Sequence, residues 1–137
     1  LDLSFCLIGD SGVQWLAGLS TAPALTSVTL HLPFNLVRDA GAKTLVALKD
    51  APALKALAIG LEANEVGDSG AEALAALKDA PCLTTLTLDL EANRVGDAGS
   101  QALVALKDAC SLTALNLNLA CNLMTEDCGR ALERALV

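Results

Sequence analysis

Aromatic residues are scarce in this chain, which has two phenylalanines, one tryptophan and no tyrosine among 137 residues. Hydrophobic residues still make up 53% of the sequence, so the core is predicted to consist of leucine, valine and alanine. The single histidine, His31, has no activated nucleophile or catalytic triad near it in the pattern. A Walker loop, a Rossmann fingerprint and an HExxH motif are also missing. We therefore predict a protein that is not an enzyme and uses no cofactor or metal.

Basic residues are outnumbered, with nine lysines and arginines against sixteen acidic residues and a net charge of −7. This excess of negative charge repels nucleic acid and anionic membranes and favours a basic protein partner. Residues 11–37 carry no acidic side chain and no lysine or arginine, and they are numerous enough to span a bilayer. They include polar residues such as Gln14, His31 and Asn35, and they align with charged segments elsewhere in the chain. We therefore predict no membrane insertion.

The cysteines form no CxxC pair and no Cys/His spacing suited to zinc. They are Cys6, Cys82, Cys110, Cys121 and Cys128. Cys82 and Cys110 could approach disulfide distance on neighbouring repeats. The favoured interpretation is that cysteine acts here as a small buried hydrophobe in a reducing compartment, which predicts an intracellular, cytoplasmic protein. The start at Leu1, without an initiator methionine or a signal-peptide profile, favours a fragment of a longer protein.

A similar sequence repeats every 29 residues along the chain. Its equivalent positions are marked by the leucines Leu25, Leu54, Leu83 and Leu112. The predicted organisation is a single domain made of a partial copy, three complete copies and a shorter last copy. These copies span residues 1–24, 25–53, 54–82, 83–111 and 112–137. Self-similarity at this period is typical of a solenoid, in which each unit buries its apolar face only against its neighbours.

The copy 83–111 shows what each repeat should form. Leucines alternate with polar residues over 86–90, which predicts a strand with one buried face. Leu103 and Leu106 are spaced for one face of a helix, and Asp97 is predicted to cap the start of that helix. The predicted fold class is therefore α/β: a right-handed solenoid of strand–turn–helix repeats, with a parallel sheet on the concave side and helices on the convex side.

Residues 88–99 read L-x-L-x-x-N-x-V-G-D-x-G, and residues 59–70 carry nearly the same text. This motif resembles leucine-rich repeat proteins of the ribonuclease-inhibitor-like subclass. The resemblance implies a strand and a full α-helix in each repeat, and a function in protein interaction. The chain departs from the pattern in two ways: its helix side is shorter by about one residue, and an added alternating pair lengthens the strand side. The added leucines are Leu32, Leu61, Leu90 and Leu119.

Two series of polar residues recur at fixed positions and are predicted to be structural. Buried amides at the first position can satisfy backbone groups of the neighbouring coil, as the resemblance also implies. Carboxylates at the second position are predicted to cap helices, with a calcium site as the alternative. The two series are Asn35, Asn64, Asn93 and Asn122, and Asp10, Asp39, Asp68 and Asp97.

Positions that should face outward from the sheet vary between copies, and these are the first candidates for binding a partner. The candidates on the sheet side are His31, Glu62, Asp89, Glu91 and Asn118. Glu62 and Glu91 occupy equivalent sites on adjacent coils, with Asp89 close by. Two interpretations stay open: a solvated edge, or a docking site for a partner that carries lysine or arginine.

The aromatic residues break the repeat at its N-terminal end and supply the second group of candidates. Phe5 and Phe34 share one position on consecutive copies, and Trp15 stands where other copies have threonine or alanine. Bulky residues here either seal the open end of the solenoid or let the N-terminal coil dock against another protein or subunit.

Three classes of function follow. The leading one is a protein–protein interaction scaffold that binds its partner through the sheet face or an edge of the solenoid. The alternative is a structural subunit of a large assembly or filament, in which solenoid ends stack. A GTPase regulator is a third class that the resemblance brings in, although the arginines Arg38, Arg94, Arg130 and Arg134 match no signature for it.

Overall fold

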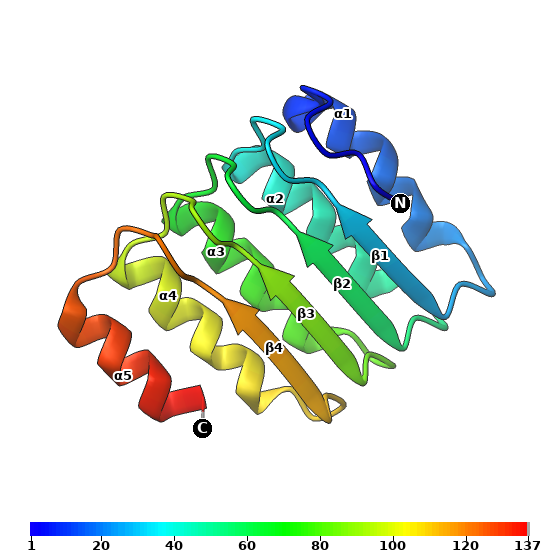
Figure 1. The fold of residues 1–137 in the computed structure, drawn as a ribbon. Coiled ribbons are helices and arrows are strands. Elements are labelled where there is room, and N and C mark those ends of the chain that lie inside the picture. Colours follow the sequence, from blue (N-terminus) through cyan, green and yellow to red (C-terminus); the bar gives the residue numbers. More distant parts are fainter. Residues whose placement is uncertain (137) are drawn as a thin grey trace.

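The computed structural model describes residues 1–136 as two layers, a sheet with a row of helices behind it (Figure 1). Within these residues the sheet has four parallel strands in chain order: β1 (Ser27–His31), β2 (Ala56–Gly60), β3 (Thr85–Asp89) and β4 (Ala114–Asn118). Strands pair in the register of the repeat, so that residues one period apart lie side by side, as Ser27 does with Ala56. The predicted α/β solenoid is confirmed.

Each strand leads into the helix of its own coil. The α-helices are α1 (Gly9–Leu16), α2 (Asp39–Leu45), α3 (Asp68–Leu74), α4 (Asp97–Val104) and α5 (Glu126–Leu136). The first four continue as the 3₁₀ segments η1 (Ala17–Thr21), η2 (Val46–Asp50), η3 (Ala75–Asp79) and η4 (Ala105–Asp108). One unbroken helix was expected in each copy. Leu103 near the end of α4 and Leu106 in η4 are both fully buried, so the change to 3₁₀ geometry keeps both side chains in the core.

The core lies between the two layers and consists of stacked rows of leucine. Leu30, Ile59 and Leu88 form one row and are each 1% exposed. The added leucines of the strand side are also buried, because the backbone pairing continues past the strands. Leu115 and Leu117 of β4 stay half-buried at the C-terminal end of the sheet.

Within residues 1–136, no helix combines the length and the apolar character that crossing a membrane requires.

Candidate partner-binding surface

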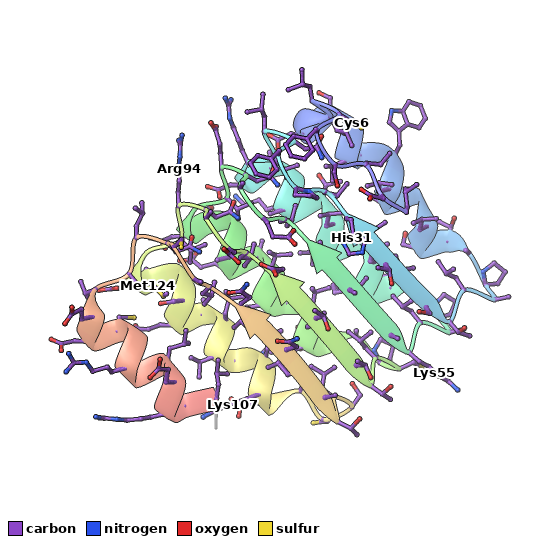
Figure 2. The ribbon with its side chains drawn as sticks, viewed as in Figure 1. Cys6, His31, Lys55, Arg94, Lys107 and Met124 are labelled. Carbon is purple, nitrogen blue, oxygen red and sulfur yellow. The ribbon has the colours of Figure 1, made fainter. Side chains whose placement is uncertain are left out.

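The face of the sheet that points away from the helices carries the variable residues. In β1, exposed residues alternate with buried ones, and His31 (labelled in Figure 2) is exposed at the end of the strand. Its neighbours across the sheet are Gly60 on one side and Asp2 on the other. Gly60 separates His31 from Asp89 on this face, and the carboxylate of Glu62 lies over it.

The acidic candidates lie at the end of β3 or just after β2 and β3, and Asn118 links two of them. The side-chain amide of Asn118 donates to Oδ2 of Asp89 and to Oε2 of Glu91, both at 3.1 Å. The second oxygen of Asp89 accepts the backbone N–H of Glu91 at 3.0 Å. Glu62 folds over Gly60, and its Oε2 atom is buried without a hydrogen-bond partner within residues 1–136. Binding of a basic partner at this cluster stays a prediction.

The asparagine series connects neighbouring coils through backbone groups. Oδ1 of Asn64 accepts the N–H groups of Asn35 and Val37 in the preceding coil, at 3.0 and 2.9 Å. Its amide donates to the backbone oxygens of Leu32 and Leu61, at 2.8 and 3.0 Å. The other asparagines of the series make equivalent contacts. These bonds fix the loops that leave the sheet.

The aspartate series differs from the prediction, because each side chain caps the helix of the next coil and not its own. Oδ1 of Asp68 accepts the N–H groups of Gly96 and Gly99, at 2.7 and 2.8 Å, at the start of α4. Asp10 and Asp39 do the same for α2 and α3. The later three aspartates are themselves the first residues of α2, α3 and α4, with no side-chain cap bond to their own helices.

Stacking explains why the cap acts between coils. The 29-residue register places the start of each helix beside the aspartate of the coil before it. A side-chain carbon at Gly99 would lie 2.6 Å from Oδ1 of Asp68, so glycine is needed for this close approach. The last aspartate, Asp97, accepts the backbone N–H of Thr125 at 2.8 Å and its hydroxyl at 2.9 Å. These two bonds hold the pKa of Asp97 below its ordinary value of 3.8.

Large apolar side chains are exposed in the loops that follow the strands of the first two coils. We call Phe5, Leu7, Phe34 and Leu36 the apolar edge; their exposed fractions are 69%, 74%, 49% and 51%. The rings of Phe5 and Phe34 stack face to face, with centroids 4.4 Å apart and an angle of 8° between their planes. Exposed apolar groups gathered in this way are typical of a surface that contacts another molecule.

The left-handed backbone at Phe5 and Phe34 recurs in the later coils without a bulky side chain, whereas the left-handed backbone at Leu7 and Leu36 does not recur there. Phe34 has a φ of 56°, and Ala63 and Ala92 make the same turn in later coils with φ of 52° and 55°. A non-glycine residue in this conformation costs about 1–2 kcal/mol. Since an alanine suffices for the turn, the fold does not require phenylalanine there.

Leu7 and Leu36 were not among the residues predicted from the sequence. Later coils carry Glu65, Arg94 and Leu123 in the same position. A comparison of this position across the copies, like the one that singles out the phenylalanines, would have revealed the contrast. The two leucines were overlooked because leucine is also the main core residue of the chain.

A charged trio continues the same loops beyond the apolar edge. Nε of Arg38 donates to Oε2 of Glu65 at 2.8 Å, and Nη2 of Arg94 donates to Oε1 at 3.2 Å. The hydrogen bond from Arg38 and the charge of Arg94 lower the pKa of Glu65. The side chains of Arg38 and Arg94 stay 66% and 63% exposed. Figure 2 shows Arg94 at the same edge of the molecule as Cys6, which lies between Phe5 and Leu7.

Trp15 projects from α1 and is 86% exposed. The aromatic side chains of the first two coils are therefore not buried as a seal over the end of the solenoid. Their exposure agrees better with the docking interpretation, which remains a proposal.

The cysteines correct another prediction. All five lie within residues 1–136 as free thiols, and Cys82 and Cys110 are not bonded to each other. Cys128 is buried, but the other four are exposed, so cysteine is mainly a surface residue here. The reason is location, because Cys82 and Cys110 lie in the turns before strands, and Cys6 and Cys121 lie in the loops after them.

A family model described as "Leucine Rich repeat" matches residues 1–17, 61–75 and 82–104. These segments of the chain are similar to leucine-rich repeats. Among solved structures, these repeats are similar to that of "Leiomodin-1 Actin-Binding Site 2 (ABS2)", with a TM-score of 0.70 and 16% sequence identity. The similarity covers 99% of this chain and 77% of the other, and at that identity it supports the fold alone. No curated protein sequence matches the chain.

Proposed function

We propose that these leucine-rich repeats form a scaffold that binds a protein partner through the apolar edge. The exposure of four large apolar side chains in adjacent loops carries this proposal. Aromatic and other large apolar anchors contribute much of the binding energy at protein interfaces. Because Ala63 and Ala92 make the same turn as Phe5 and Phe34, the turn itself gives no reason for the two phenylalanines.

The loops that carry the apolar edge are held in place before any partner arrives. The N–H of Phe5 donates to the oxygen of Pro33 at 3.0 Å, and the N–H of Phe34 donates to the oxygen of Glu62 at 3.1 Å. Asn35 adds bonds to the loop of the first coil on both sides of Leu7. A surface fixed in this way loses little conformational entropy when it binds, which favours affinity.

We also propose that the repeats are a variant of the ribonuclease-inhibitor-like subclass. Support comes from the pairing of a strand with a true α-helix in each complete copy. The 3₁₀ ending of the helices and the added leucine pair are the features in which this variant differs.

A capture experiment tests the scaffold. The immobilised chain is compared with Phe34→Ala and Leu36→Ala variants for retention of proteins from the cells that make it. Purified actin is included as a probe, because the similar leiomodin-1 structure is of an actin-binding site. Leu123→Ala is the matched control, since Leu123 occupies the position of Leu36 on the last coil and is 67% exposed.

We expect a specific protein to be retained by the wild type and by Leu123→Ala, and lost from the two edge variants. Such a pattern would follow from the loss of apolar anchors that a partner covers. Equal retention by all four proteins would refute the proposal.

The same assay tests the acidic cluster as a second contact. Charge reversal by Glu62→Lys with Glu91→Lys should weaken capture of a basic partner through like-charge repulsion. Unchanged retention by this double variant would exclude a contribution from the cluster.

A further inference from the structure

We infer, on the basis of the proposed function, that the apolar edge takes an extended acidic segment of the partner. An apolar side chain of that segment packs on Phe34 and Leu36, and a carboxylate farther along it binds Arg38 and Arg94. The partner segment inferred here is acidic, whereas the net charge of the chain predicts a basic partner.

The balance of hydrogen-bond donors points to a carboxylate. Arg38 and Arg94 share Glu65, and each of its two oxygens is already occupied by one of them. A guanidinium carries five N–H donors, so most donors of both side chains face solvent. Within this trio, two cations beside one anion leave one positive charge, and the carboxylate of Asp10 lies next to the backbone of Arg38. A carboxylate is the group that matches the planar fork of arginine in shape and charge.

The spacing of the coils sets the spacing within the bound segment. Leu36 and Arg94 occupy the same position two coils apart, which corresponds to about 10 Å at the strand spacing of a sheet. An extended chain advances about 3.3 Å per residue. A carboxylate roughly three residues after the apolar anchor therefore reaches Arg94, while one nearer the anchor reaches Arg38.

The neighbouring surface favours one path for this segment. Asp89 ends β3 and Glu91 lies in the turn just after it, and their negative charges repel an acidic segment that crosses the sheet. A path over Leu36, Arg38 and Arg94 runs farther along the loops than Glu91 and keeps the partner on the apolar edge and the arginines.

Synthetic peptides test this directly on the whole chain. The first probe is a short peptide with a Leu-Phe pair followed by aspartate and glutamate residues. In the second, lysines replace the acidic residues, and in the third, serines replace the Leu-Phe pair. Binding is measured by fluorescence anisotropy at low and at moderate salt. We expect the first probe to bind at least about tenfold more tightly than either of the others, and its affinity to fall with salt.

Variants of the chain complete the test. Phe34→Ala should lower the affinity for the first probe about tenfold. The double variant Arg38→Gln, Arg94→Gln should lower this affinity several-fold and make it less dependent on salt. Leu123→Ala should leave the affinity unchanged, and unaltered thermal melting of each variant shows that it folds.

Several results would overturn the acidic partner. These are equal or tighter binding of the lysine probe, no effect of the double arginine variant, or no binding of the first probe at any soluble concentration. None of these results affects the capture experiment. If the Phe34→Ala variant failed to retain the captured protein, that loss would still support the scaffold. Dimerisation of the chain alone that Phe34→Ala abolishes would instead assign the edge to a second copy.

Discussion

At the residue scale, the left-handed turn at Phe5, Phe34 and their equivalents shows which features the fold requires and which belong only to the surface. Five equivalent residues adopt this conformation, and none of them is glycine; they are Phe5, Phe34, Ala63, Ala92 and Cys121. Glycine would make the turn without steric cost. The alanines at this position therefore carry a conformational cost that glycine would avoid.

Replacing Ala63 by glycine should stabilise the fold. The change removes the left-handed penalty of about 1–2 kcal/mol, while the greater freedom of glycine in the unfolded chain costs about 0.5–1 kcal/mol. We expect a net gain of up to about 1.5 kcal/mol in the free energy of unfolding, measured by urea denaturation. The matched control is Ala73→Gly in α3, which should cost about 1 kcal/mol because that residue is helical. A loss in Ala63→Gly as large as in Ala73→Gly would show that the turn is not strained.

At the element scale, the aspartate series fastens each helix to the coil before it. For α5, which packs at the C-terminal end of the solenoid, this link is Asp97 with the N–H and hydroxyl of Thr125. The carboxylate form accepts both bonds, and its folded-state pKa is lowered. A lowered pKa adds stability above the unfolded pKa of 3.8, and this stability is lost as the pH falls through the folded value.

The thermal midpoint should therefore fall more steeply with acid in the wild type than in Asp97→Asn. Asparagine keeps one acceptor oxygen for the N–H of Thr125 but has no charge to titrate. The measurement is thermal unfolding at a series of pH values from neutral to below 3.8. Glu65 and Asp2, whose pKa values are also lowered, are common to both proteins and cancel in the comparison. Parallel curves for the two proteins would contradict the assignment.

The sequence repeat predicts some structural features of these elements but not others. Strand register and the inward leucine rows follow from the period, because identical units can stack in one way that buries every apolar face. The repeat does not predict which helix Asp68 caps. Its own helix and the helix of the next coil begin with the same residues, and only their distances from the Asp68 carboxylate distinguish them. The buried row at Leu90 followed from alternation, whereas the exposure of Leu7 and Leu36 depended on loop geometry that leucine itself does not indicate.

At the scale of the whole molecule, the first and last coils of this chain lack the residues that join its interior coils. Each interior junction combines an asparagine that reaches back with an aspartate that reaches forward, as Asn64 and Asp39 do. On the first coil, Cys6 stands in the asparagine position, and on the last coil, Glu126 stands in the aspartate position. Two copies stacked end to end would therefore meet without either bond, which disfavours a filament built in this way.

We accordingly expect the chain to sediment as a monomer at micromolar concentration. The apolar edge alone is also small, because stable protein interfaces bury about 800 Å² on each partner, far more than four side chains supply. The informative comparison is a Cys6→Asn, Glu126→Asp double variant, which restores the joining residues at both ends. Analytical ultracentrifugation should show this variant to be the more prone to associate as concentration rises. Polymers of the wild type that grow with concentration would instead favour the structural subunit, because the ends would then stack without the asparagine and aspartate bonds.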